Sequence, residues 1–258
     1  MHPILFNLGS LPIHTYGVLL ALGVFLGLIA LRINARRLGL DPEAAQNEAL
    51  WLVLAGLAGA RLAFVLLEPG PLLGNLGRFV FIWQGGLVFY GGLAAALPLV
   101  VWRGRSQGWG AAAWADLLAP SLALGQALGR VGCFFSGDSY GKPFDGPWAV
   151  VFSAPHSLAP LGIPLHPTQL YTAGALLIIF ALLTWLLPRR RFAGQVVLTY
   201  GLLHGVARLI IEPFRADWRG AVVVTGLTPT GLFALGLALV CLLGLFWGLR
   251  RQRRTRLA

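Results

Sequence analysis

The chain has 258 residues, of which 57% are hydrophobic and only 11% charged, and its formal net charge is +11. Soluble domains carry about a quarter charged residues, so this composition excludes a soluble globular protein and indicates an integral membrane protein. A basic soluble protein would suggest nucleic acid, but arginines beside apolar segments are better explained by membrane topology, and we expect no nucleic-acid partner.

Seven apolar segments are long enough to cross a bilayer, which takes about 20 mostly apolar residues per helix. The sequence therefore predicts an all-α integral membrane protein with about seven transmembrane helices, arranged as a single domain over residues 1–258. The motif DPEA at 41–44 predicts a helix start, with Asp41 as the cap and proline at the first helical position. In chain order, the predicted spans are 13–32, 49–67, 87–102, 112–130, 169–187, 194–211 and 227–249.

The longest polar connection is residues 133–167, between the fourth and fifth spans. It is rich in glycine, proline and serine, and its stretch PWAVVF has the composition of a short strand. We therefore predict a small loop subdomain here, on the outer side of the membrane.

Arginines flank the spans unevenly, because clusters follow only the first, third, fifth and seventh. Arginines next to spans are retained on the cytoplasmic side, so we expect the N-terminus outside and the C-terminus in the cytoplasm. The same arginines are expected to contact anionic membrane lipids. The clusters are Arg32, Arg36 and Arg37; Arg103 and Arg105; residues 189–191; and the tail RRQRRTRLA at 250–258.

Seven polar residues from six spans are predicted to converge on the outer half of the bilayer. Arg61 lies about twelve residues into the second span, roughly 18 Å along a helix. Arg208 is similarly deep in the sixth span, and Arg130 closes the fourth span at its outer end. An arginine in the bilayer costs about 2.5–3.5 kcal/mol unless it is paired or hydrated. The seven residues are Arg61, Arg130, Arg208, Tyr16, Tyr90, His166 and Gln169.

Arginines on the predicted outer side outnumber the carboxylates there, which indicates that they bind an anion. Lipid phosphate is always present at this depth, and guanidinium groups bind phosphate through paired hydrogen bonds. We favour a phosphate-binding cavity over the alternative, an ion-pair network that satisfies itself. The arginines are Arg61, Arg78, Arg130, Arg208, Arg215 and Arg219, and the carboxylates are Glu68, Asp138 and Glu212.

The sixth span places His204, Arg208 and Glu212 four residues apart, on one helix face. We favour Arg208 as a phosphate ligand oriented by Glu212, since a pair that only stabilises a helix end does not require burial. The alternative is such a stabilising pair. Tyr90 is followed by Gly91 and Gly92, which permit a ligand or a neighbouring helix to approach closely, although tyrosines at this depth are also common interfacial anchors.

Six stretches resemble, in order and spacing, the motifs of the bacterial prolipoprotein diacylglyceryl transferase family. They are TYGVLLALG in the first span, GARLAFVL (59–66), FYGGL (89–93), GRVGCFFSGDSYG (129–141), HPTQLY (166–171) and ARLIIEPFR (207–215). The resemblance implies a seven-span enzyme of the bacterial inner membrane with its active site toward the outer leaflet. It would transfer the diacylglyceryl group of phosphatidylglycerol to the lipobox cysteine thiol of a preprolipoprotein, releasing glycerol 1-phosphate.

The resemblance also implies roles for individual residues. Arg130 matches the phospholipid-binding arginine of the signature, and Gly141 its closing glycine. Arg208, Glu212 and Tyr16 match essential residues of the family. We therefore expect Arg208, Tyr90, Glu212 and Tyr16 to be catalytic. The expected substrate-binding residues are Arg130, Gly132, Asp138, Gly141, Arg61, His166, Gln169, Gly91, Gly92 and His204.

Three positions depart from the family pattern. Tyr90 stands where members have histidine, Cys133 where they have asparagine, and Asp138 where they have glutamate. A phenol ionises near pH 10 and is a poor base at neutral pH, so any general base would be another group, with His204 and His166 in reserve. We expect an arginine field to favour the thiolate of the substrate instead.

Other classes of function remain open from the sequence. A lipid or anion transporter could use the same basic cavity, but it would need polar residues on the inner half of the spans. Only Asp116 is predicted there, paired with Arg103 or Arg105. A paralogous transferase with a different acceptor is the other alternative. We expect no metal or other cofactor, because the histidines lack ligand spacing and the carboxylates are few.

Overall fold

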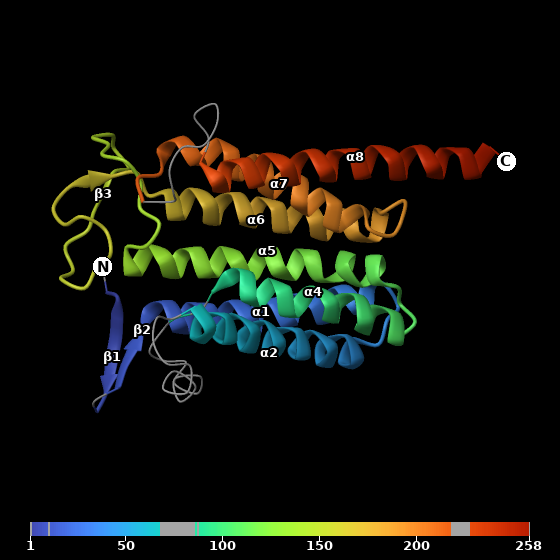
Figure 1. Cartoon of the computed structure of the whole chain (residues 1–258), viewed down its shortest axis with the longest axis horizontal. Helices are drawn as coiled ribbons and strands as arrows, with labels where there is room; N and C mark the ends of the chain where they lie inside the picture. Colours follow the sequence, from blue (N-terminus) through green and yellow to red (C-terminus); the bar gives the residue numbers. More distant parts are fainter. Residues whose placement is uncertain (1, 10, 68–85, 87, 218–227, 258) are drawn as a thin grey trace. The chain divides into compact units, whose positions relative to one another are not determined.

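The computed structural model describes residues 2–9, 11–67, 86, 88–217 and 228–257 (Figure 1). The chain forms two compact units, one of Met1–Ala30 with Asp116–Ala258 and the other of Leu31–Ala115. Glu68, Arg78 and Arg219, which entered the predicted charge surplus, lie outside the described residues, as do the predicted starts of the third and seventh spans.

Each of the seven predicted spans corresponds to a helix in the described part of the chain. Six of these helices are long and apolar enough to cross a membrane. The exception is α4, which has 18 residues and carries Arg103 and Arg105 in its last turn. The helices are α1 (Thr15–Arg37), α2 (Pro42–Leu67), α4 (Phe89–Ser106), α5 (Ala111–Ser136), α6 (Thr168–Leu186), α7 (Gln195–Ile211) and α8 (Pro229–Leu257).

Short elements connect these helices. The strands β1 (Ile4–Leu8) and β2 (Leu11–His14) pair antiparallel before α1. A single turn of 3-10 helix follows α6 (η3, Leu187–Arg189), and another follows α7 (η4, Glu212–Phe214). Pro42 begins α2, and the side chain of Asp41 accepts a hydrogen bond from the Glu43 N–H at 2.9 Å, which confirms the predicted cap.

Helix α5 continues six residues beyond its predicted end at Arg130. It ends at Ser136, and the next residue, Gly137, has a φ of 76°, the left-handed conformation that favours glycine. The Asp138 N–H donates to the Cys133 carbonyl and the Gly137 N–H to the Phe134 carbonyl, which closes the last turn. Arg130 therefore lies about 9 Å inside the helix end. Cys133, predicted to start the loop subdomain, belongs to the helix.

The connection from α5 to α6 contains the short strands β3 (Val150–Val151) and β4 (Pro164–Leu165), which pair antiparallel. The predicted strand in PWAVVF is confirmed. Leu165 of β4 forms a small buried cluster with Phe152 and Ala159. Lys142 links this connection to η4, because its N–H donates to the Phe214 carbonyl. Its own carbonyl accepts from the His166 N–H at the other end of the connection.

Asp116 has different partners from those predicted. It is fully buried and lies 3.7 Å from Arg190, and it accepts hydrogen bonds from the N–H groups of Gly194 and Val197. These N–H groups belong to the start of α7, where the first N–H groups of a helix have no partner within the helix.

Arg103, one of the two predicted partners of Asp116, pairs with a different carboxylate. Arg103 donates to both carboxylate oxygens of the buried Glu48 from the neighbouring α2, and Gln107 donates to Glu48 at 2.6 Å. No role was predicted for Glu48 from the sequence.

Helices α2 and α4 pack through glycines. A Cβ atom on Gly91 would collide with the Gly59 carbonyl and the Ala63 side chain, and one on Gly92 would lie 2.9 Å from the Gly56 carbonyl. The glycines of the FYGGL motif therefore permit close approach of a neighbouring helix.

We predict that Gly91→Ala destabilises the protein by about 1–3 kcal/mol, because a methyl group there meets backbone atoms that cannot rotate away. Gly174→Ala in α6 is the matched control, since nothing lies within 4 Å of the added Cβ atom. It is expected to leave stability unchanged or slightly raised. Thermal unfolding in detergent micelles measures both, and equal midpoints for the two variants would contradict the packing account.

Candidate functional site

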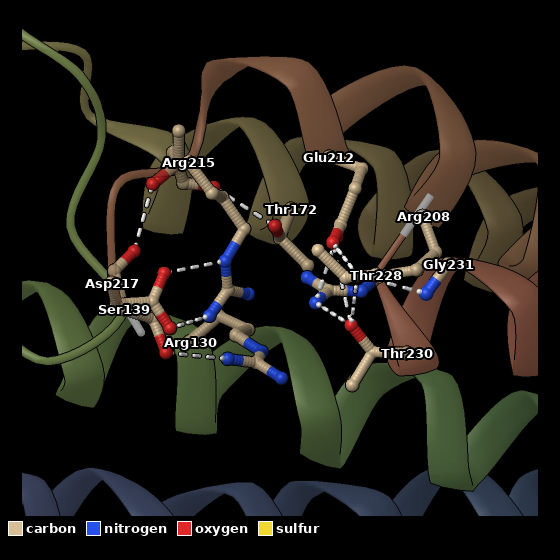
Figure 2. A network of polar contacts seen from close by, with 11 residues as sticks. Arg130, Ser139, Thr172, Arg208, Glu212, Arg215, Asp217, Thr228, Thr230 and Gly231 are labelled. Carbon is tan, nitrogen blue, oxygen red and sulfur yellow. Dashed lines mark hydrogen bonds and ion pairs between the residues drawn. The ribbon is translucent and has the colours of Figure 1, made fainter. Parts of the chain in front are cut away.

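Arg130 is held from the turn that follows α5. Its Nη1 donates to the Ser139 hydroxyl at 3.3 Å (Figure 2). Ser139 is buried and has a φ of 59°, a left-handed conformation unusual for serine. The start of α6 fixes this turn, because Thr168 donates to the Ser139 carbonyl at 2.8 Å and Gln169 donates to the Asp138 carbonyl at 2.7 Å.

No carboxylate in the described part of the chain neutralises the charge of Arg130. Among the described residues no aspartate or glutamate oxygen lies within 4 Å of its guanidinium group. The Asp138 carboxylate, which belongs to the expected substrate-binding set, forms no such ion pair in the described part of the chain. Arg130 is half-buried, so water replaces a counter-ion only in part.

Arg208 and Glu212 form the predicted pair on one face of α7, with Nη2 and Oε2 3.0 Å apart. Two threonines at the start of α8 extend it. Thr228 donates to Glu212 Oε1, and Thr230 accepts from Arg208 at 3.3 Å. This pair is therefore linked to a second helix, which the sequence analysis did not predict (Figure 2).

Arg215 is buried and paired with Asp217. Its Nε lies 2.9 Å from Oδ1 and its Nη2 2.7 Å from Oδ2, a bidentate contact. The backbone of Arg215 also forms a bridge with that of Gly141. Asp217 was not among the predicted site residues, although its position two residues after Arg215 could have indicated an ion pair.

Tyr16 packs against the signature glycine Gly132. A Cβ atom on Gly132 would lie 3.0 Å from the Tyr16 ring and 3.2 Å from its Cα. The phenol lies close enough to Arg130 and Cys133 to interact electrostatically with both, and 38% of Tyr16 is exposed. The structure therefore brings Tyr16 beside Arg130.

His166 lies in an aromatic cluster of the α5–α6 connection. Its ring stacks on Phe144 at 3.9 Å, and its Nδ1 is hydrogen-bonded to the Tyr171 hydroxyl at 3.0 Å. Burial lowers the pKa of His166 below its ordinary value, so the neutral ring is favoured. A Cβ atom on Gly141 would collide with the His166 backbone, so this glycine is required for packing here.

Gln169 and His204 complete the predicted set in this unit. Gln169 is almost fully buried, and its Oε1 has no hydrogen-bond partner among the described residues. The His204 ring lies 5.5 Å from that of Tyr200. It is also within electrostatic reach of Arg130 and Arg208.

The remaining predicted residues belong to the other compact unit. Arg61 is 2% exposed, donates to the Gly86 carbonyl at 3.0 Å, and lies 5.2 Å from the Phe64 ring centroid. Tyr90 is 62% exposed. That Arg61, Tyr90, Gly91 and Gly92 join the same site stays a prediction.

The structure adds residues that the sequence analysis missed. Most are hydroxyl side chains at helix ends, whose sequence signal is only a serine or threonine near a predicted boundary. They are Ser139, Thr168, Asp217, Thr228 and Thr230. No group of three or more histidine, cysteine, aspartate or glutamate side chains that could hold a metal occurs among the described residues.

These observations define a class of protein: a multi-pass membrane protein that gathers arginines at one end of its helices α5 and α7, where α6 and α8 begin (Figure 1). The chain matches the family model described as prolipoprotein diacylglyceryl transferase over residues 3–247 and belongs to that family.

The chain is similar in sequence to several curated proteins over most of their length. A protein of Clostridium tetani named phosphatidylglycerol–prolipoprotein diacylglyceryl transferase is 32% identical over 86% of this chain and 88% of its own. Proteins of the same name from Finegoldia magna and Synechococcus elongatus are 31% and 34% identical, over 93% and 97% of this chain and 94% and 89% of their own. These names favour a transferase over the transporter alternative.

Proposed function

We propose that this enzyme transfers the diacylglyceryl group of phosphatidylglycerol to prolipoproteins, and that the arginines of the first unit bind the phosphate. The reaction follows from family membership and from the names of the relatives. The observation that carries the phosphate site is Arg130, a half-buried guanidinium whose contact in the described residues is the neutral Ser139 hydroxyl.

Arginines that pair with a carboxylate and Arg130 would have different roles in the site. Arg208 and Arg215 are each neutralised by a carboxylate, so their positions are set before substrate binds. Arg130 has no carboxylate partner among the described residues, so an anion beside it would balance its charge and replace lost hydration. A phosphate diester carries one negative charge and presents two oxygens to a guanidinium fork. The site therefore suits a phospholipid headgroup.

The acceptor would be the lipobox cysteine thiol of the prolipoprotein. Its sulfur attacks the glycerol C3 carbon of the diacylglyceryl group, and a C–S bond forms as the bond from C3 to the phosphate oxygen breaks. The electron pair leaves with glycerol 1-phosphate, and the thiol proton is released. The arginines stabilise the negative charge that grows on the leaving phosphate and favour the attacking thiolate.

We predict that Arg130→Ala lowers transfer of labelled diacylglyceryl from phosphatidylglycerol to a lipobox peptide by at least about a hundredfold, since it removes a donor aimed at developing charge. Arg130→Lys keeps the charge but not the fork, so intermediate activity is expected. Arg105→Ala, an exposed arginine, is the control and should leave transfer unchanged. Full transfer by Arg130→Ala would overturn the phosphate assignment.

Tyr90 would position the headgroup by donating a hydrogen bond. Tyr90→Phe should lower transfer about three- to tenfold, because a neutral hydrogen bond contributes about 0.5–1.5 kcal/mol. The same peptide assay measures it, with Tyr140→Phe as a control. A loss beyond a hundredfold would instead indicate that the hydroxyl takes part in proton transfer.

We infer an inner-membrane location with the N-terminus and the phosphate site on the outer side, from the arginines that follow the first, third, fifth and seventh spans. A C-terminal reporter that is fluorescent only in the cytoplasm should be fluorescent. A C-terminal phosphatase that is active only outside should be inactive. The reverse pattern would place the site on the cytoplasmic face.

A further inference from the structure

Helix α8 starts with a complete N-terminal cap. The Gly231 N–H donates to the Thr228 hydroxyl at 3.2 Å, and the Leu232 N–H donates to the Thr228 carbonyl at 2.9 Å. Thr228 is therefore the cap residue, followed by Pro229 at the first helical position. The residues of this cap also contact the Arg208–Glu212 pair.

The cap reaches the carboxylate of Glu212. Thr228 Oγ1 donates to Glu212 Oε1, and Thr230 Oγ1 lies 3.3 Å from the same oxygen. The other oxygen, Oε2, lies 3.0 Å from the Arg208 guanidinium. Each carboxylate oxygen thus has its own kind of partner, hydroxyls on one side and a guanidinium on the other (Figure 2).

The directions of donation follow from the available protons. A hydroxyl has one proton to donate, and an arginine only donates. Thr230 therefore accepts from Arg208 at 3.3 Å and directs its own proton to Glu212 or to Thr228. Thr228 accepts from the Gly231 N–H and donates to Glu212. Each of these contacts therefore joins one donor to one acceptor.

This arrangement anchors Arg208 from a second element. Glu212 follows directly on α7, so the Arg208–Glu212 pair could shift together with that helix end. Thr230 belongs to α8 and contacts both members of the pair. An arginine held from two helices is confined to a narrower range of orientations, which is what recognition of a fixed phosphate needs.

We propose that Thr228 and Thr230 are positioning residues that hold Arg208 in its phosphate-binding orientation. The inference rests on the proposed function, because it assigns these hydroxyls to the same phosphate site. Neither threonine contacts the reacting atoms in this account. Both act through Arg208 and Glu212.

Thr230→Val tests the proposal, because valine keeps the shape and removes the hydroxyl. The expected result is a fall in kcat/KM of about ten- to hundredfold, as for loss of a hydrogen bond to a charged group. The KM for phosphatidylglycerol in mixed micelles should rise while the KM for the lipobox peptide stays the same. Thr230→Ser, which restores the hydroxyl, should recover most of the activity.

Thr199→Val is the matched control. Its hydroxyl bonds to the Gln195 carbonyl of its own helix at 2.8 Å, so the same chemical change is made in α7 without touching the pair. It should leave both KM values and the rate unchanged. Thr228→Val should reproduce the rise in KM for phosphatidylglycerol and also lower the unfolding temperature, because it removes the cap of α8.

Unchanged kinetics in Thr230→Val would overturn the positioning role, and so would equal losses of activity in Thr230→Val and Thr230→Ser. A lower unfolding temperature in Thr228→Val with an unchanged KM for phosphatidylglycerol would also overturn it. Arg130→Ala separates this failure from failure of the proposed function. If Arg130→Ala abolishes transfer while Thr230→Val does not affect it, the phosphate site stands and only the threonine inference falls.

Discussion

A guanidinium group inside an apolar protein needs partners for its charge, and this requirement organises the arginine site. Arg215 and Arg208 each pair with a carboxylate. Arg130 has no carboxylate partner among the described residues, and it contacts the hydroxyl of Ser139. The cost of leaving such a charge partly buried is several kcal/mol unless an anion or water compensates it. Two arginines are therefore held by carboxylates of the protein itself, and in the proposed function the substrate phosphate would pair with the third.

Helix ends supply most of the groups that hold these arginines. The left-handed turn after α5 presents Ser139, the first turn of α6 fixes that turn through Thr168, and the cap of α8 reaches Glu212. Helix ends leave backbone N–H and C=O groups without partners inside the helix, so side chains gather there to satisfy them. In the proposed phosphate site the same side chains would also orient the arginines toward the substrate.

Close packing explains the glycines at several motif positions of this chain. Gly132 allows Tyr16 to pack on α5, Gly141 allows the backbone of His166 to approach, and Gly91 allows α2 and α4 to touch. Each lies where an added Cβ atom would meet neighbouring atoms at or below about 3 Å. The motifs thus contain two kinds of residue: glycines that let elements pack closely, and charged residues that those elements hold in place.

Local patterns in the sequence determined the helices, the cap at Asp41, the strand in PWAVVF and the shared face of Arg208 and Glu212, because each depends on residues close together in the chain. Contacts between distant segments were decided only by the tertiary structure. Asp116 binds the start of α7 rather than Arg103, and Arg130 lies inside α5 because the left-handed glycine comes seven residues later. Which hydroxyl meets which arginine depends on how helix ends are brought together, and a threonine at a helix start carries no sign of its distant partner.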